Sequence, residues 1–229
     1  MSAAAWRALA VLAGTLGLVS LAAPAAGQQA ESGLEIELRG GLVISTALVE
    51  DELASPGLLR FLLGGTAMPD RGAGPVRLAA APAPMLALAA RSPLAPGVWA
   101  EVEGGWSFAR LEADDGVATW EMDRLGILHV ALGARYFPQE VYYLRGGVGL
   151  IRYDADGQGL FREGSELTPH LQAGLGTTRG FDRFRISVDL SGQAHRFGTV
   201  AMREMGGQDG TVYRGMLQVG VAFGGRTGS

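Results

Sequence analysis

The stretch from Phe184 to His195 reads FRISVDLSGQAH, and its apolar and polar residues alternate one by one. Successive side chains of a β-strand point to opposite faces of the sheet, so this alternation predicts a strand with one apolar and one polar face. The polar face carries Arg185 and Asp189, which could meet either bulk water or the inside of a closed barrel. The patterns in the rest of the chain are needed to distinguish these two cases.

The same alternation recurs along the chain. Between residues 98 and 111, for example, Val98, Ala100 and Val102 alternate with Glu101 and Glu103. Strands are expected at about 34–46, 85–94, 98–111, 119–137, 141–153, 168–178, 184–197 and 213–223. Eight is an even number, which suits antiparallel strands that close into a barrel.

The connections between these strands alternate in length. Tight turns are expected at 95–97, 138–140 and 180–183. Longer connections are expected at 47–82, 112–118, 154–167 and 198–212. Short turns on the periplasmic side and longer loops outside are typical of outer-membrane barrels. The chain is therefore predicted to be all-β, an eight-stranded antiparallel up-and-down transmembrane β-barrel with a polar interior.

The N-terminal region predicts export. Arg7 precedes an apolar run from Ala8 to Ala23, which small residues and then polar residues follow. This order is typical of a cleaved secretory signal, whereas a membrane anchor would need roughly 20 apolar residues and a basic flank beyond them. We expect residues 1–27 to be the signal peptide and residues 28–229 to form one barrel domain.

Composition excludes several classes of site. The chain has no cysteine, so it forms neither disulfides nor thiolate metal sites. Its formal net charge is -4, and its arginines are scattered singly, which argues against a nucleic-acid partner. No metal site and no cofactor are expected.

Charges of both signs lie on the polar faces of the expected strands. A three-residue turn at 95–97 would place Arg91 opposite Glu101. A buried charge without a partner is costly, so these charges should pair inside the barrel. The predicted interior network consists of Glu35, Glu37, Arg39, Arg91, Glu101, Glu103, Arg135, Arg145, Arg185 and Asp189.

Aromatic residues gather near the strand ends, where two belts would lie at the two bilayer interfaces. The predicted girdle consists of Trp106, Phe108, Tyr136, Tyr142, Phe184 and Phe223. Further aromatic residues toward the longer connections are Trp120, Tyr153, Phe197 and Tyr213. A soluble lipocalin-like barrel would instead place its apolar face inside, around a ligand. The belts and the rarity of charges on the apolar faces favour the membrane barrel.

The last expected strand carries Gly215, Val219, Val221 and Phe223, which resemble the terminal signal of outer-membrane barrels. With this strand, nearly the whole mature chain resembles the small eight-stranded outer-membrane barrels, such as the OmpA transmembrane domain, OmpX and OmpW. The chain departs from their pattern by continuing from Gly224 to Ser229. The resemblance implies a monomer in the outer membrane of a Gram-negative cell envelope. It also implies contact with outer-membrane lipid and recognition of Gly215 to Phe223 by the barrel insertion machinery.

All three histidines lie on the polar faces of the expected strands, where catalytic side chains would lie. Ser191 and His195 share one face of a strand, but four residues along a strand separate them by roughly 13 Å, too far for a nucleophile and its base. A turn at 180–183 would place His170 opposite Gln193. No catalytic residues are expected, and the polar side chains are interpreted as interior filling.

The 47–82 connection is unusual because Leu58 to Leu63 is mostly apolar. We expect this segment to cap the mouth of the barrel rather than to touch lipid or to form an additional strand pair. Pro75, Pro82 and Pro84 argue against regular strand pairing here, because proline cannot donate to a ladder.

The interior of an eight-stranded barrel is narrow and is normally filled by side chains. We therefore expect a structural or surface-interaction role, with the interior plugged by the Arg, Glu and Asp network. Three alternatives stay open: a conduit for a small or apolar molecule, a lipid-modifying outer-membrane enzyme, and a soluble lipocalin-like binding barrel.

Overall fold

The structure is a computed structural model that describes residues 33–54, 74–117, 119–155, 167–181, 184–204 and 208–224. The expected signal peptide, residues 1–27, lies outside these residues. The strands are β1 (Glu35–Ser45), β2 (Ala47–Ala54), β3 (Gly74–Ala80), β4 (Ala83–Ala95), β5 (Val98–Asp114), β6 (Thr119–Tyr136), β7 (Tyr142–Ala155), β8 (Thr168–Gly180), β9 (Arg185–Phe197) and β10 (Gly210–Gly224). The short helix α3 (Val200–Glu204) precedes β10. No helix in the described residues is long and apolar enough to cross a membrane.

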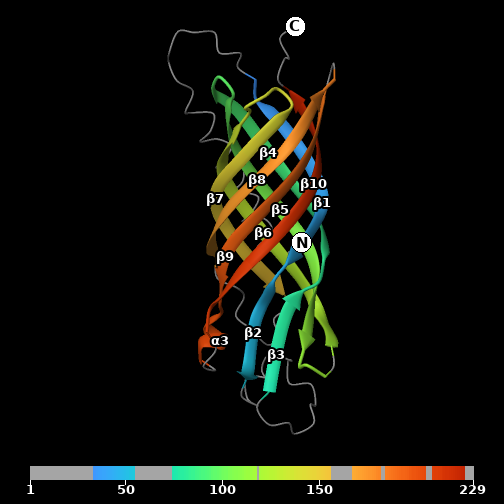
Figure 1. Ribbon diagram of the computed structural model, residues 1–229, viewed down its shortest axis with the longest axis vertical. Helices are drawn as coiled ribbons and strands as arrows, with labels where there is room; N and C mark the ends of the chain where they lie inside the picture. The colour runs from blue at the N-terminus through green and yellow to red at the C-terminus, as the bar shows by residue number, and fades with distance from the viewer. Residues whose placement is uncertain are drawn as a thin grey trace.

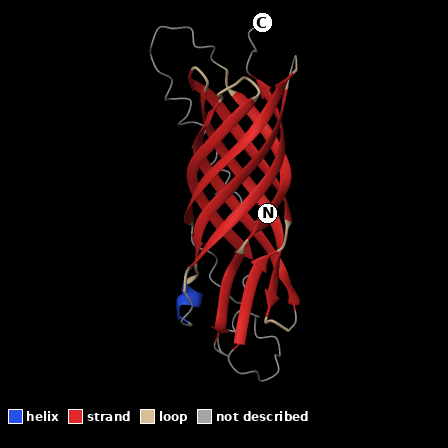
Figure 2. Cartoon of the chain, viewed as in Figure 1, coloured by secondary structure: helices blue, strands red, loops and turns tan. Residues whose placement is uncertain are grey.

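Eight of the strands close into an antiparallel barrel (Figure 2). β1 pairs with β10 on one side and with β4 on the other. The pairing of β5 with β6 completes the ring. This arrangement confirms the predicted fold class, and each expected strand range overlaps one of the eight barrel strands.

The two ends of the barrel differ (Figure 1). The tight connections after β4, β6 and β8 lie at one end, together with the first residues of β1 and the last residues of β10. We call this end the turn end. β2, β3 and α3 lie at the opposite end, which we call the loop end.

The prediction that 47–82 lacks strand pairing was wrong at both flanks. β2 pairs with β3, and β3 pairs with the end of β5, so the wall continues beyond the barrel (Figure 1). Pro75 and Pro84 lie inside β3 and β4. Pro84 lies opposite Leu42 of β1, but neither proline has a partner in β5, whose ladder begins at Arg77 in β3 and at Met85 in β4. Proline is tolerated where no neighbour requires its missing N–H. The apolar run from Leu58 to Leu63 lies outside the described residues.

The apolar faces of the strands point outward. Leu42, Leu217, Leu190, Leu175 and Leu144 are register partners on successive strands, and their exposed fractions lie between 53% and 58%. Membrane barrels carry an apolar band of this kind on their outer face, where it contacts lipid. On a protein in water, a large exposed apolar patch would instead mark an interaction site.

The register between β8 and β9 differs from the prediction by two residues. His170 lies opposite His195 rather than opposite Gln193. The first pair of the β8–β9 ladder is Gly180 with Arg185, so residues 181–184 form the connection instead of the predicted 180–183. A shift of two residues leaves every side chain on its predicted face, because the side-chain period of a strand is two.

Candidate functional site

The interior of the barrel is divided into three layers along its axis. The order is visible along β6, where Arg135 lies toward the turn end, His129 in the middle, and Ile127 and Leu125 toward the loop end. We call these parts the charged layer, the histidine layer and the apolar layer.

Arg39 is the centre of the charged layer. Its Nη2 lies 2.6 Å from carboxylate oxygens of both Glu37 and Glu101, and its Nη1 donates to Glu103. Arg135 also bridges two carboxylates, at 3.1 Å from Glu37 and 2.7 Å from Glu101. All five side chains are buried, so the ion pairs are shielded from water.

Arg145 extends the charged layer toward β9. Its guanidinium lies 3.0 Å from Glu103 and 3.3 Å from Asp189. The Tyr143 hydroxyl donates to the second oxygen of Asp189 at 3.1 Å, and the Arg135 guanidinium lies 4.3 Å from the centre of the Tyr143 ring. These contacts fix the aromatic ring between ions of opposite charge.

Glu35 closes the charged layer at the turn end. Its carboxylate lies 2.5 Å from Arg91 and 3.4 Å from Arg185, whose side chain is 24% exposed. The register places Arg91 opposite both Glu35 and Glu101, as the 95–97 turn predicts for Glu101. The structure thus brings all ten predicted network residues together, nine of them buried and Arg185 at the rim.

Period-two spacing explains how the strands supply this layer. Glu35, Glu37 and Arg39 occupy alternate positions of β1, so they point into the barrel together. Gly220 of the neighbouring β10 leaves space for Glu37, since a Cβ at this position would collide with the Glu37 carboxylate and with Ser187. The Ser187 hydroxyl uses this space to donate to Glu37.

The histidine layer contains all three histidines. His129 Nε2 lies 3.3 Å from Glu103, and the His129 and His170 ring centres are 6.1 Å apart. His195 Nε2 is 2.6 Å from the Tyr153 hydroxyl and not bonded to Ser191. In the described residues, no group of three or more His, Asp or Glu side chains is placed to hold a metal ion.

Arg214 belongs to the same layer and was not among the predicted site residues. It is 1% exposed, and its two terminal nitrogens donate to Gln193 and Ser107, both at 2.9 Å. Its position in β10 has the same parity as Gln218, which is also buried. That parity was the signal that could have identified Arg214.

The apolar layer fills the loop end of the interior. Leu48, Leu78, Leu125, Ile127 and Ile151 are each at most 1% exposed and belong to one cluster of buried residues. The predicted polar interior therefore extends over only the turn end and the middle of the barrel. At the loop end, the strands carry apolar residues on both faces. The sequence there does not alternate between apolar and polar residues, so it did not reveal this layer.

Helix α3 contributes to the apolar layer. Met202 is fully buried in the cluster. The Thr199 hydroxyl caps the helix by accepting a hydrogen bond from the Met202 backbone N–H at 3.1 Å. The cap orients Met202 toward the interior.

The aromatic residues divide between the two faces. The six predicted girdle residues point outward with exposed fractions between 38% and 57%. Tyr153 and Phe197 are instead buried, with ring centres 5.0 Å apart, because their parity in β7 and β9 directs them into the barrel. The side chain of Trp120 lies outside the described part of the structure.

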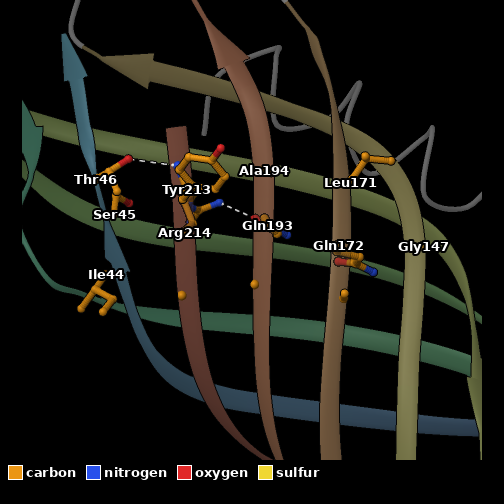
Figure 3. A pocket seen from close by; sticks show the side chains of 13 residues that line it. Ile44, Ser45, Thr46, Gly147, Leu171, Gln172, Gln193, Ala194, Tyr213 and Arg214 are labelled. Atoms are coloured by element: carbon orange, nitrogen blue, oxygen red, sulfur yellow. Dashed lines mark hydrogen bonds between the residues drawn. The ribbon is translucent and has the colours of Figure 1, made fainter. Parts of the chain in front are cut away.

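An apolar hollow of about 730 Å³ extends along the barrel wall over β1, β10, β9 and β8 (Figure 3). Ile44, Leu171 and Tyr213 line it and are each more than half exposed, so the hollow faces outward. It exists because Gly192 and Ala194 leave the surface between the larger side chains unfilled. Its lining also includes Gln172, Gln193 and Arg214, and Arg214 donates a hydrogen bond to Gln193 (Figure 3).

Neither protein-family models nor curated proteins match the chain. The solved structure of the outer membrane protein OprG from Pseudomonas aeruginosa is similar, with 13% identity and a TM-score of 0.50 over 82% of this chain and 95% of OprG. Neisserial surface protein A matches with 12% identity and a TM-score of 0.47, over 83% and 96% of the two chains. Ail, the attachment invasion locus protein of Yersinia pestis, matches with 14% identity and a TM-score of 0.38, over 84% and 99%. The closed barrel and the likeness to OprG show that the chain has the fold of the small eight-stranded outer-membrane β-barrel proteins.

Proposed function

We propose that the protein is an integral outer-membrane barrel with a closed interior and a structural or surface-interaction role. The contact between Arg135 and Glu37 carries this proposal. These residues belong to β6 and β1, which are not neighbours in the barrel, yet their side chains lie 3.1 Å apart. Ion pairs that cross the lumen leave no room for general diffusion.

The proposal includes the cellular setting. Residues 1–27 direct export, the apolar outer wall contacts outer-membrane lipid, and the insertion machinery reads Gly215 to Phe223 of β10. The turn end faces the periplasm and the loop end faces outward, which is the arrangement of outer-membrane barrels generally. The protein acts as a monomer without a cofactor, nucleic acid or catalytic chemistry.

Conductance in planar bilayers tests the closed interior. We expect the wild-type protein to stay near the baseline, because the charged and apolar layers block the lumen in series. Arg39→Ala/Glu103→Ala removes one opposite-charge pair but leaves the apolar layer, so it should also stay closed. Adding Leu125→Ala/Ile127→Ala should produce a steady conductance, since both layers are then reduced.

The matched control is Arg110→Ala/Glu121→Ala. This opposite-charge pair lies 2.6 Å apart, but its side chains are 62% and 66% exposed, so its loss should not change conductance. A steady conductance of the wild-type protein would contradict the closed interior. Boiling-sensitive gel migration shows for each variant that the barrel has folded.

A second function, a conduit for a small apolar molecule, is supported by a seam in the wall. The β1–β10 ladder ends at Ser45 and Arg214, with Thr46 and Tyr213 joined just beyond. Farther toward the loop end, β2 pairs only with β3 among the described strands. An apolar molecule in the apolar layer would leave sideways into lipid through this unpaired edge.

Uptake of an apolar fluorophore by whole cells tests the conduit. Expression of the wild-type protein should accelerate uptake severalfold, and Ile127→Gln should abolish the gain by placing an amide in the apolar layer. Ile127→Val, which keeps the layer apolar, serves as the control. Uptake no faster than in cells without the protein, with folded barrel present, would eliminate this function.

A further inference from the structure

Arg214 is a buried cation whose side-chain partners among the described residues are neutral. Gln193 and Ser107 accept its hydrogen bonds, and no ion pair among the described residues includes it. A guanidinium does not lose its proton in a protein, so this group cannot become neutral. An isolated buried charge is costly, which points to a missing anion.

The charged layer cannot supply that anion. Its five carboxylates, Glu35, Glu37, Glu101, Glu103 and Asp189, are matched by its five arginines, Arg39, Arg91, Arg135, Arg145 and Arg185. Glu103, which also approaches His129 of the histidine layer, is already in contact with two of these arginines. Arg214 therefore adds one positive charge to an interior that is otherwise balanced.

Several buried hydrogen-bonding groups near Arg214 and elsewhere in the histidine layer have no partner among the described residues. Gln193 lies opposite it in the ladder and accepts through Oε1, while Gln193 Nε2 and Arg214 Nε have no partner among the described residues. The Ser191 hydroxyl and both ring nitrogens of His170 are also buried without partners there. Arg214 and its neighbour Gln193 thus each carry an unused N–H donor beside an unpaired cation, which is what an anion site offers.

We infer that the histidine layer binds one carboxylate, held by Arg214 and Gln193. The carboxylate belongs either to a small free anion or to the head of an amphiphile whose chain packs against the apolar layer. The second source fits because the Tyr153 ring, which belongs to the apolar cluster, lies against His195 with ring centres 5.6 Å apart. This site is independent of whether the barrel is closed or is an apolar conduit.

Thermal unfolding of the refolded protein in chloride-free detergent buffer, at constant ionic strength, tests the site. The probes are formate, octanoate and octanol. A saturating carboxylate should raise the unfolding midpoint of the wild-type protein by about 5 °C. Arg214→Gln should lose this response, and Arg110→Gln, which removes an exposed cation, should retain it.

The probes distinguish the two sources. Stabilisation by both formate and octanoate identifies a site for a free carboxylate, whereas stabilisation by octanoate alone identifies an amphiphile head. Octanol that stabilises as well as octanoate, or a response that survives in Arg214→Gln, would overturn the inference. No response of the wild-type protein to either carboxylate would do the same.

Gln193→Glu supplies the proposed carboxylate from within and decides the matter even if Arg214→Gln does not fold. The Gln193 side-chain oxygen is already 2.9 Å from Arg214, so the new carboxylate needs no rearrangement. We expect a higher midpoint than that of the wild-type protein without carboxylate and no further rise with formate or octanoate. A midpoint at or below the wild-type value would show that the charge of Arg214 is already compensated.

Discussion

Replacing Arg39 with methionine should lower the free energy of unfolding by about 3–5 kcal/mol, the cost typical of breaking a buried ion pair by removing one partner. Methionine keeps the apolar stem of the side chain but removes the guanidinium that contacts Glu37, Glu101 and Glu103. Their negative charges then lie buried with fewer partners. Urea unfolding in detergent, followed by tryptophan fluorescence, measures the loss.

Arg110→Met is the control for this change. Arg110 forms an ion pair of 2.6 Å with Glu121, but at the surface, where such a pair contributes about 0–1 kcal/mol. If both variants lost the same small amount of stability, the charged layer would not be shielded from water. The structure would then be wrong about the packing of the lumen.

Leu217→Arg should cost about 2–4 kcal/mol, the value for arginine on the lipid face near the bilayer midplane. Leu217 is 53% exposed and lies midway along β10 between Leu42 and Leu190, its register partners. An arginine here would place a charge in hydrocarbon. The urea midpoint of the protein refolded in lipid vesicles measures the cost.

Val117→Arg provides the comparison, because Val117 is 75% exposed in the connection between β5 and β6 and lies beyond the barrel wall. Its substitution should change the midpoint little. A Leu217→Arg protein as stable as Val117→Arg would mean that the exposed leucines do not face lipid.

Alternation of side chains made the barrel predictable. It is strongest where one face is uniformly apolar, as at Leu217, Val219 and Val221, and it placed the charged residues inside before any distance was known. The 95–97 turn predicted that Arg91 lies opposite Glu101, but which arginine meets which carboxylate across the lumen was not predictable. The contact of Arg135 with Glu37 crosses the lumen, so it depends on how the closed ring places strands that are not neighbours.

Two features were missed for physical reasons. Pro75 and Pro84 argued against strands, yet the structure uses them where the β5 ladder has not begun. Near the loop end of β6, Leu125 and Ile127 point inward while Leu128 points outward, so both faces are apolar and the period-two signal disappears. Polarity alone therefore could not reveal the apolar layer.

The central claim is that the barrel has an apolar outside and a filled inside. The most direct measurement is gel migration before and after boiling, with circular dichroism, of the chain without residues 1–27. We predict a strand-rich spectrum and a compact band that shifts on boiling, both only when the chain is refolded in detergent or lipid. A soluble, strand-rich monomer formed without detergent would contradict the account, because its apolar faces would then line a ligand cavity as in a lipocalin-like barrel.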